Sequence, residues 1–80
     1  MPSSIFTQRH QAFIAFIAST RRAAGVTQAE LAARLGKPQS FVSKVERGER
    51  RLDVMEFCQV AEALGIDPAE LLKVFVQPGR

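Results

Sequence analysis

Apolar residues recur along the chain at the three- and four-residue spacing of amphipathic helices, and no stretch alternates convincingly between apolar and polar positions as a strand would. Four of the five glycines lie at the ends of these apolar runs, where helices commonly close on a left-handed residue. The pattern therefore predicts an all-α fold, a compact domain of five helices. They are expected at residues 5–24, 28–35, 38–47, 53–64 and 68–75.

Residues at the expected helix starts agree with these ranges. Two pairs have the spacing of a capping box, in which a side chain before the helix and the third helical residue bond each other's backbone N–H groups. The pairs are Thr27 with Glu30 and Asp53 with Glu56. Pro38 and Pro68 suit first helical positions, where a missing N–H is harmless. Both kinds of signal divide the chain at the same places.

Eighty residues predict a single domain, residues 1–80, with a thin core, and only the first few residues and the tail 77–80 are expected to be flexible. The longest apolar stretch near the start is too short to span a bilayer and lacks the order of segments found in a signal peptide. The lone Cys58 lies among apolar residues, so we expect an inert buried thiol. These features favour the cytoplasm.

Residues able to carry catalysis or hold a metal are few and scattered. His10 stands alone, without the spaced histidines or cysteines of a metal site, so neither a metal nor another cofactor is predicted. Glu30, Glu56 and Glu70 each occupy the third position of a helix start, where capping accounts for them. Because catalysis needs a constellation that this sequence lacks, an enzyme is not expected.

The charge of the chain is unevenly distributed, although the net value is only +3. Residues 34–51 hold six basic and two acidic side chains, a local charge of +4, whereas residues 52–72 hold five acidic side chains and no basic one. The molecule should therefore have one positive side, which is typical of proteins that bind a phosphate backbone.

The segment 27–48 reads as two short helices joined by a tight connection at residues 35–37, which is helix-turn-helix geometry. A step of about 100° per residue separates a polar arc from an apolar one along the second helix. The polar arc holds Gln39, Ser40, Ser43, Lys44 and Arg47, and the apolar arc holds Phe41, Val42 and Val45. A helix with one free polar side suits the DNA major groove, and basic residues just after it can neutralise phosphates.

Over roughly residues 13–72 the sequence resembles Xre-like helix-turn-helix proteins, the kind to which phage repressor and Cro belong. The resemblance rests on TQAELA from Thr27, the Gly36 turn, the stretch SKVERG at residues 43–48, and ALGI before residues 67–68. It implies a lambda-repressor-like fold and double-stranded DNA as the partner.

The resemblance also implies roles for individual residues. Bases would be contacted by Gln39, Ser40, Ser43 and Lys44. Phosphates would be contacted by Gln28, Lys37, Arg47, Arg50 and Arg51. A structural salt bridge would join Arg21 to Glu46.

Two segments are more apolar than a thin core requires. They hold Phe6, Phe13, Ile14, Phe16 and Ile17 near the start, and Leu71, Leu72, Val74, Phe75 and Val76 near the end. They could meet within one subunit or across a two-fold axis. We expect a homodimer, with Phe16, Leu72 and Phe75 as candidate interface residues.

These observations together predict a DNA-binding transcriptional regulator that acts in the cytoplasm, on the nucleoid, as a homodimer. Its third helix would enter the major groove of a palindromic operator. A phage-type repressor, a restriction-modification controller and an antitoxin all remain open. The alternative is a protein-interaction module or antitoxin whose apolar helix 1 and C-terminal surfaces bind a protein partner.

Overall fold

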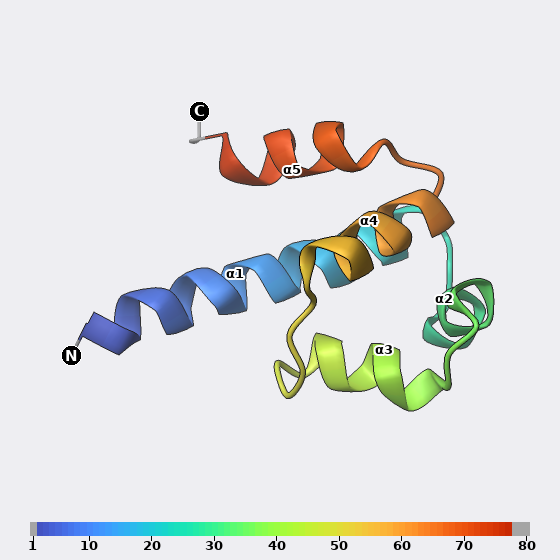
Figure 1. Ribbon diagram of the computed structural model, residues 1–80, viewed down its shortest axis with the longest axis horizontal. Helices are drawn as coiled ribbons and strands as arrows, with labels where there is room; N and C mark the ends of the chain where they lie inside the picture. The colour runs from blue at the N-terminus through green and yellow to red at the C-terminus, as the bar shows by residue number, and fades with distance from the viewer. Residues whose placement is uncertain (1, 78–80) are drawn as a thin grey trace.

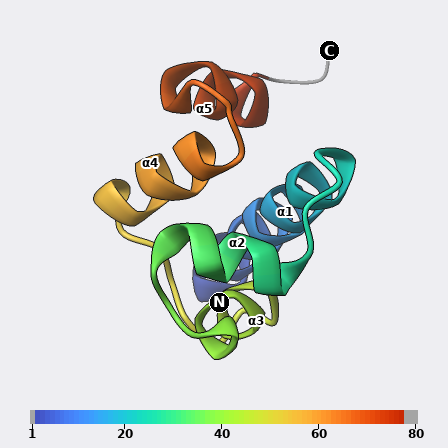
Figure 2. The same cartoon turned by 90° about the vertical axis from the view of Figure 1, so that its right-hand side faces the viewer.

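A computed structural model describes the backbone of residues 2–77 and the side chains from Gln8 onward. Within this range the chain forms α1 (Pro2–Ala23), α2 (Gln28–Leu35), α3 (Gln39–Glu46), α4 (Val54–Ala63) and α5 (Pro68–Val76), with no strand between them. Figure 1 shows α3 and α5 on opposite sides of the long α1, and the turned view in Figure 2 again places them at opposite ends. The predicted all-α fold with five helices is confirmed.

The capping residues account for where the middle helices begin. Thr27 Oγ1 accepts a 3.0 Å hydrogen bond from the Glu30 N–H, while the Thr27 N–H donates to Glu30 Oε1 over 2.8 Å. The reciprocal bonds between Asp53 and Glu56 start α4 in the same way. Both predicted capping boxes are therefore present, and each satisfies two donors that a helix start leaves open.

The bounds of α2 agree with the sequence-based range, whereas both ends of α1, α3 and α4 and the end of α5 differ from it, by three residues at the start of α1 and by one elsewhere. The first helix begins at Pro2 and not at residue 5. Pro38 is not the first helical residue but the N-cap of α3, with extended backbone at φ −70° and ψ 154°. A proline in either position leaves no N–H unpaired, so the residue type alone could not separate them. The side chain of Phe6 and residues 78–80 of the predicted flexible tail lie outside the described residues.

The core lies where α2 packs against α3 and α4, with α1 closing one side. Its largest fully buried side chains are Ile17 from α1 and Leu31 from α2. Val42 and Val45 of α3 are each only 3% exposed, so the apolar arc of α3 faces inward. This packing fixes the orientation of α3 and leaves its other side at the surface.

Aromatic contacts hold α5 onto α1. The Phe75 ring lies 5.3 Å from both Phe13 and Phe16, measured between ring centroids, and Phe13 also contacts Phe57 of α4 at 5.8 Å. Such pairs add about 0.5–1.5 kcal/mol each beyond their burial. The two apolar segments noted in the sequence thus meet within one subunit through Phe16 and Phe75.

The cysteine is less enclosed than the sequence suggests. Cys58 is only partly buried, so the prediction of a buried thiol is corrected. Its side chain borders an apolar hollow between the start of α4 and the start of α5, beside Val54 and Leu72. Val54 is 77% exposed and Leu72 is 46% exposed, so neither side chain shields this side of the thiol from solvent.

Candidate nucleic-acid interface

The turn between α2 and α3 depends on a left-handed residue. Gly36 has φ +68° and its N–H donates to the carbonyls that end α2, while the Lys37 N–H donates to the Ala32 carbonyl over 3.0 Å. A side chain at Gly36 would meet no neighbouring atom, but its backbone conformation would be strained. The short turn holds α3 across α2 and prevents the two helices from running antiparallel at length.

The outer side of α3 presents the polar residues singled out in the sequence. Gln39, Ser40 and Lys44 are exposed, and Ser43 is half-buried, with its Oγ donating to the Ser40 carbonyl over 3.4 Å. The side chains on this surface, which we call the α3 outer face, are Gln39, Ser40, Ser43 and Lys44. Two of the four are small, so the backbone of α3 can approach a groove closely. The face combines donors and acceptors able to bond base edges.

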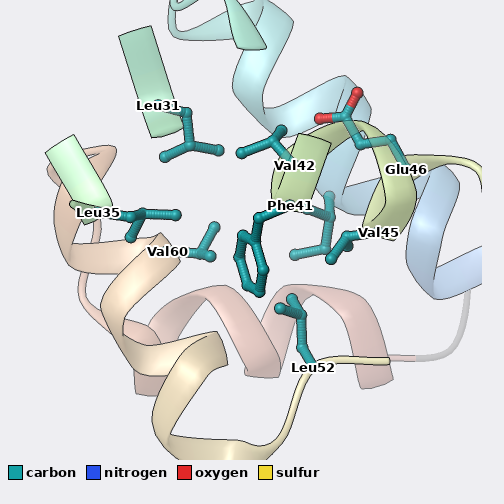
Figure 3. A pocket seen from close by; sticks show the side chains of 9 residues that line it. Leu31, Leu35, Phe41, Val42, Val45, Glu46, Leu52 and Val60 are labelled. Carbon is teal, nitrogen blue, oxygen red and sulfur yellow. The ribbon is translucent and has the colours of Figure 1, made fainter. Parts of the chain in front are cut away.

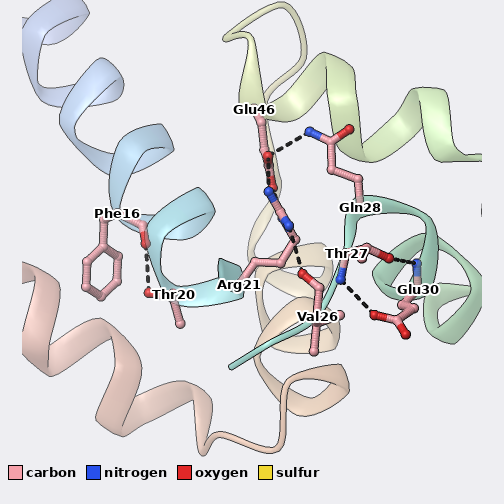
Figure 4. Close-up of polar contacts among 8 residues, drawn as sticks. All are labelled: Phe16, Thr20, Arg21, Val26, Thr27, Gln28, Glu30 and Glu46. Atoms are coloured by element: carbon pink, nitrogen blue, oxygen red, sulfur yellow. Dashed lines mark hydrogen bonds and ion pairs between the residues drawn. The ribbon is translucent and has the colours of Figure 1, made fainter. Parts of the chain in front are cut away.

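A buried ion pair joins α1 to the end of α3 (Figure 4). Arg21 Nε donates to Glu46 Oε2 over 2.7 Å and Nη2 donates to Oε1 over 3.1 Å, with the two side chains 9% and 7% exposed. Arg21 Nη1 also donates to the Val26 carbonyl over 2.7 Å, which ties in the segment before α2. The fork geometry locks three parts of the chain together.

The Glu46 carboxylate is held ionised by its donors. Burial alone would raise the pKa of Glu46, but hydrogen bonds from Arg21 and Gln28 and the arginine charges outweigh it, and the pKa falls below its ordinary value. Gln28 Nε2 donates to Glu46 Oε1 over 2.8 Å. Gln28 is one of the predicted phosphate contacts, and its amide is thus hydrogen-bonded within this subunit. The two partners are 18 residues apart in the chain, so no local sequence pattern predicts the bond.

The basic residues around α3 differ in how far they are already occupied. Arg47 pairs with Glu49, with Nε 3.1 Å from Oε2, and both side chains are 56% exposed. Arg50 pairs with Glu56 at 2.8 Å. Hydrogen bonding to the arginines lowers the pKa of both Glu49 and Glu56. Within the described part of the chain, ion pairs involve neither Lys37, Lys44 nor Arg51.

Phe41 belongs to the packing of α3 and not to its outer face. Figure 3 shows its ring directed inward, between Val60 of α4 and Leu52 of the loop that precedes α4. The residue is half-buried and lies against the core. Its position gives α3 an aromatic anchor near its first turn.

Grouping of histidine, cysteine and carboxylate residues at metal-binding distance does not occur among the residues that the structure describes. No helix within residues 2–77 is long and apolar enough to cross a membrane. The arrangement of a short turn, a packed inner face and a free polar outer face therefore defines the class of helix-turn-helix DNA-binding proteins.

Comparison with known proteins identifies the family. Residues 17–71 match the helix-turn-helix family, so the chain belongs to it, and specifically to its Xre-like members. The chain resembles an XRE-family like protein from Pseudomonas syringae pv. tomato str. DC3000, with 51% identity and a TM-score of 0.85 over 92% of this chain and 90% of that one.

Two curated relatives are regulators of transcription by name. An uncharacterized HTH-type transcriptional regulator, y4dJ, from Sinorhizobium fredii (strain NBRC 101917 / NGR234), is 42% identical over 69% of this chain and 71% of its own length. Repressor protein C of Rhizobium phage 16-3 is 36% identical over 80% of this chain but only 24% of its own length. The chain is accordingly a DNA-binding regulator of the helix-turn-helix class, and its relatives are regulators and not enzymes.

Proposed function

We propose that this protein binds a palindromic DNA operator as a homodimer and inserts the α3 outer face into the major groove of each half-site. The observation that carries the proposal is the division of α3, whose apolar side is buried while its polar side is free. A two-fold dimer on B-DNA would read half-sites about 34 Å apart, one helical turn.

Base recognition falls to the side chains of the α3 outer face. The Gln39 amide can pair with the two adenine groups in the major groove, and Lys44 can donate to guanine. Ser40 and Ser43 can bond several bases and are small enough to let the helix approach. These four residues would set the sequence that is bound.

Phosphate contacts fall to residues that border this face. Lys37 precedes α3, Arg47 and Arg51 follow it, and all three side chains are exposed. Gln28 lies at the first position of α2 and is half-buried. Arg47 would exchange Glu49 for a phosphate, and because their pair is exposed, that exchange costs little.

Replacing Gln39 with alanine should weaken binding mainly on the preferred sequence. The loss should be about 1–3 kcal/mol on the duplex that the chain enriches from a random library, and much less on a shuffled duplex. Arg51→Ala is the control, since it should weaken binding to both duplexes alike and reduce the salt dependence of that binding. Fluorescence anisotropy on both duplexes measures these losses, and equal losses for Gln39→Ala would end its base-reading role.

The homodimer would form through the apolar surface that α4 and α5 leave open. Phe16 and Phe75 are half-buried against each other, so of the predicted interface residues Leu72 is the one left exposed, at 46%. It lies beside Val54, which is 77% exposed, at the edge of the hollow next to Cys58. Exposed apolar side chains grouped in this way commonly mark a protein interface.

Replacing Leu72 with glutamate should separate the dimer, because a carboxylate would be buried without a partner in the interface. Sedimentation equilibrium should give the mass of a single chain, 8.8 kDa, for the variant and twice that for the unmodified protein. Gln59→Glu is the matched control, since Gln59 is exposed elsewhere on α4. A variant that keeps the dimer mass would exclude Leu72 from the interface.

The same exposed apolar residues favour a second candidate, in which this surface binds a different protein, as in an antitoxin. Binding to DNA would then be weak and independent of sequence. A heteromeric complex that Leu72→Glu abolishes, formed by a chain that is monomeric alone, would support this alternative over the homodimer.

A further inference from the structure

We infer that Arg50 is a positioning residue that braces α3 for reading DNA, and that it is not one of the phosphate contacts. The inference rests on the proposed function and deepens it, because it assigns a determinant of specificity outside the α3 outer face. It follows from a set of contacts that runs from Phe41 on α3 through Arg50 in the loop to Glu56 on α4.

Two cations lie over the Phe41 ring. The Arg50 guanidinium carbon is 4.7 Å from the ring centroid, and Lys37 Nζ is 5.1 Å from it. Cations held against an aromatic face at this distance are attracted to it, and arginine can also stack its plane on the ring. The ring is thus fixed by residues that come from both ends of α3.

The edge of the Arg50 guanidinium is occupied as well. Nη1 donates to Glu56 Oε1 over 2.8 Å, Nη2 donates to Glu56 Oε2 over 2.9 Å, and Nη1 also donates to the Arg51 carbonyl over 2.6 Å. Hydrogen bonding to Glu56 raises the pKa of Arg50 further above its already high value. To bind Arg50, a DNA phosphate would have to displace the Glu56 carboxylate, which already pairs with the positive guanidinium through two hydrogen bonds.

Glu56 is itself held in place. Its Oε1 accepts the Asp53 N–H over 3.0 Å, as part of the capping box that starts α4. The side chain is 17% exposed, against 42% for Arg50. The contacts therefore connect the start of α4 to the aromatic anchor of α3, and they hold the loop at residues 47–53 in one path.

Loss of the Glu56 charge should change DNA affinity in opposite directions, depending on whether Arg50 positions α3 or contacts a phosphate. Replacing Glu56 with glutamine removes one negative charge near the DNA, which by electrostatics alone should tighten binding to any duplex. Glutamine also preserves the capping box, since it serves equally as the third helical residue. If Arg50 positions α3, the loosened brace should instead weaken binding to the preferred sequence, by roughly 3- to 10-fold.

The test compares four variants of the full chain on two duplexes, the one enriched from a random library and a shuffled version. Glu56→Gln and Arg50→Lys disturb the brace, the second because lysine keeps the charge but lacks the planar fork. Their matched controls are Glu62→Gln, an exposed carboxylate on the same helix, and Arg22→Lys, an exposed arginine at the end of α1. Circular dichroism at the assay temperature establishes that each variant is folded.

The expected result is a selective loss. Glu56→Gln and Arg50→Lys should bind the enriched duplex roughly 3- to 10-fold more weakly, with unchanged or tighter binding to the shuffled one, while both controls stay within about twofold on each. If Arg50→Lys and Glu56→Gln bind the enriched duplex as tightly as the unmodified protein, or more tightly, the inference about Arg50 is overturned. The proposed function is not affected by that result. An unmodified protein that binds both duplexes equally removes the proposed function, and the inference with it.

Discussion

Replacing Arg21 with methionine is expected to lower the free energy of unfolding by about 3 kcal/mol at pH 7. The substitution keeps a long side chain in place but leaves the Glu46 carboxylate, 7% exposed, without its bidentate partner. It also leaves the Val26 carbonyl without the bond from Arg21 Nη1. A chain of 80 residues has a total stability of about 4–12 kcal/mol, so the loss is a large share. Chemical denaturation followed by circular dichroism measures it.

The matched control is Arg22→Met, because Arg22 is the exposed neighbour on the same helix and its loss should change stability by less than about 0.5 kcal/mol. If the two substitutions changed the free energy of unfolding equally, the ion pair between Arg21 and Glu46 would contribute no more to stability than the loss of any one positive charge on α1.

The pH dependence of this pair has a definite sign. The pKa of Glu46 is lowered in the folded state, so its contribution is present above the ordinary carboxyl value of 4.5 and is lost as the pH falls through the lowered value. In Arg21→Met the largest opposing donor is gone and burial raises the pKa of Glu46 instead. The difference in stability between the two proteins should therefore shrink on acidification, and a constant or growing difference would contradict this account.

Replacing Leu31 with alanine should cost about 3–4 kcal/mol of unfolding free energy. Leu31 is 1% exposed and lies where α2 meets α3 and α4, facing Val42 and Val60. The cost combines lost burial with a cavity that α3 can fill only by shifting from its position. Thermal or urea denaturation measures the change, and binding to the enriched duplex should weaken as well.

Val74→Ala is the control for this substitution, since it also shortens an apolar side chain but at a site that is 61% exposed. It should change stability by less than about 0.5 kcal/mol. A comparable loss at Val74 would show that its surface is covered in solution, and a small loss at Leu31 would show a core that repacks freely.

The helices were predictable because local signals repeat one another at each boundary. Thr27 with Glu30, and Asp53 with Glu56, mark their helix starts by short spacings that a sequence displays directly. Gly36 marks the end of α2 through a conformation that few other residues adopt. Pro38 is the N-cap of α3 and not its first residue, and the sequence alone does not separate the two positions because a proline satisfies the same constraint in both.

The contacts among charged side chains at the candidate site were not predictable in the same way. The pairing of Arg50 with Glu56 depends on how the loop folds back against α4, and the bond from Gln28 to Glu46 joins two separate helices. Periodicity identifies which side of α3 is polar, but it does not rank nearby arginines by the partners they already have. That ranking, which separates Arg51 from Arg50, comes from tertiary structure.

The central claim is that α3 reads a DNA sequence, and selection from a random duplex library at roughly physiological salt tests it most directly. Specific binding by such proteins stands about 10³-fold or more above nonspecific binding, so enrichment should be clear within a few rounds. The account predicts recovery of a palindrome whose half-sites are one helical turn apart. A folded protein that enriches no sequence would contradict it and would shift the assignment to binding of a protein partner.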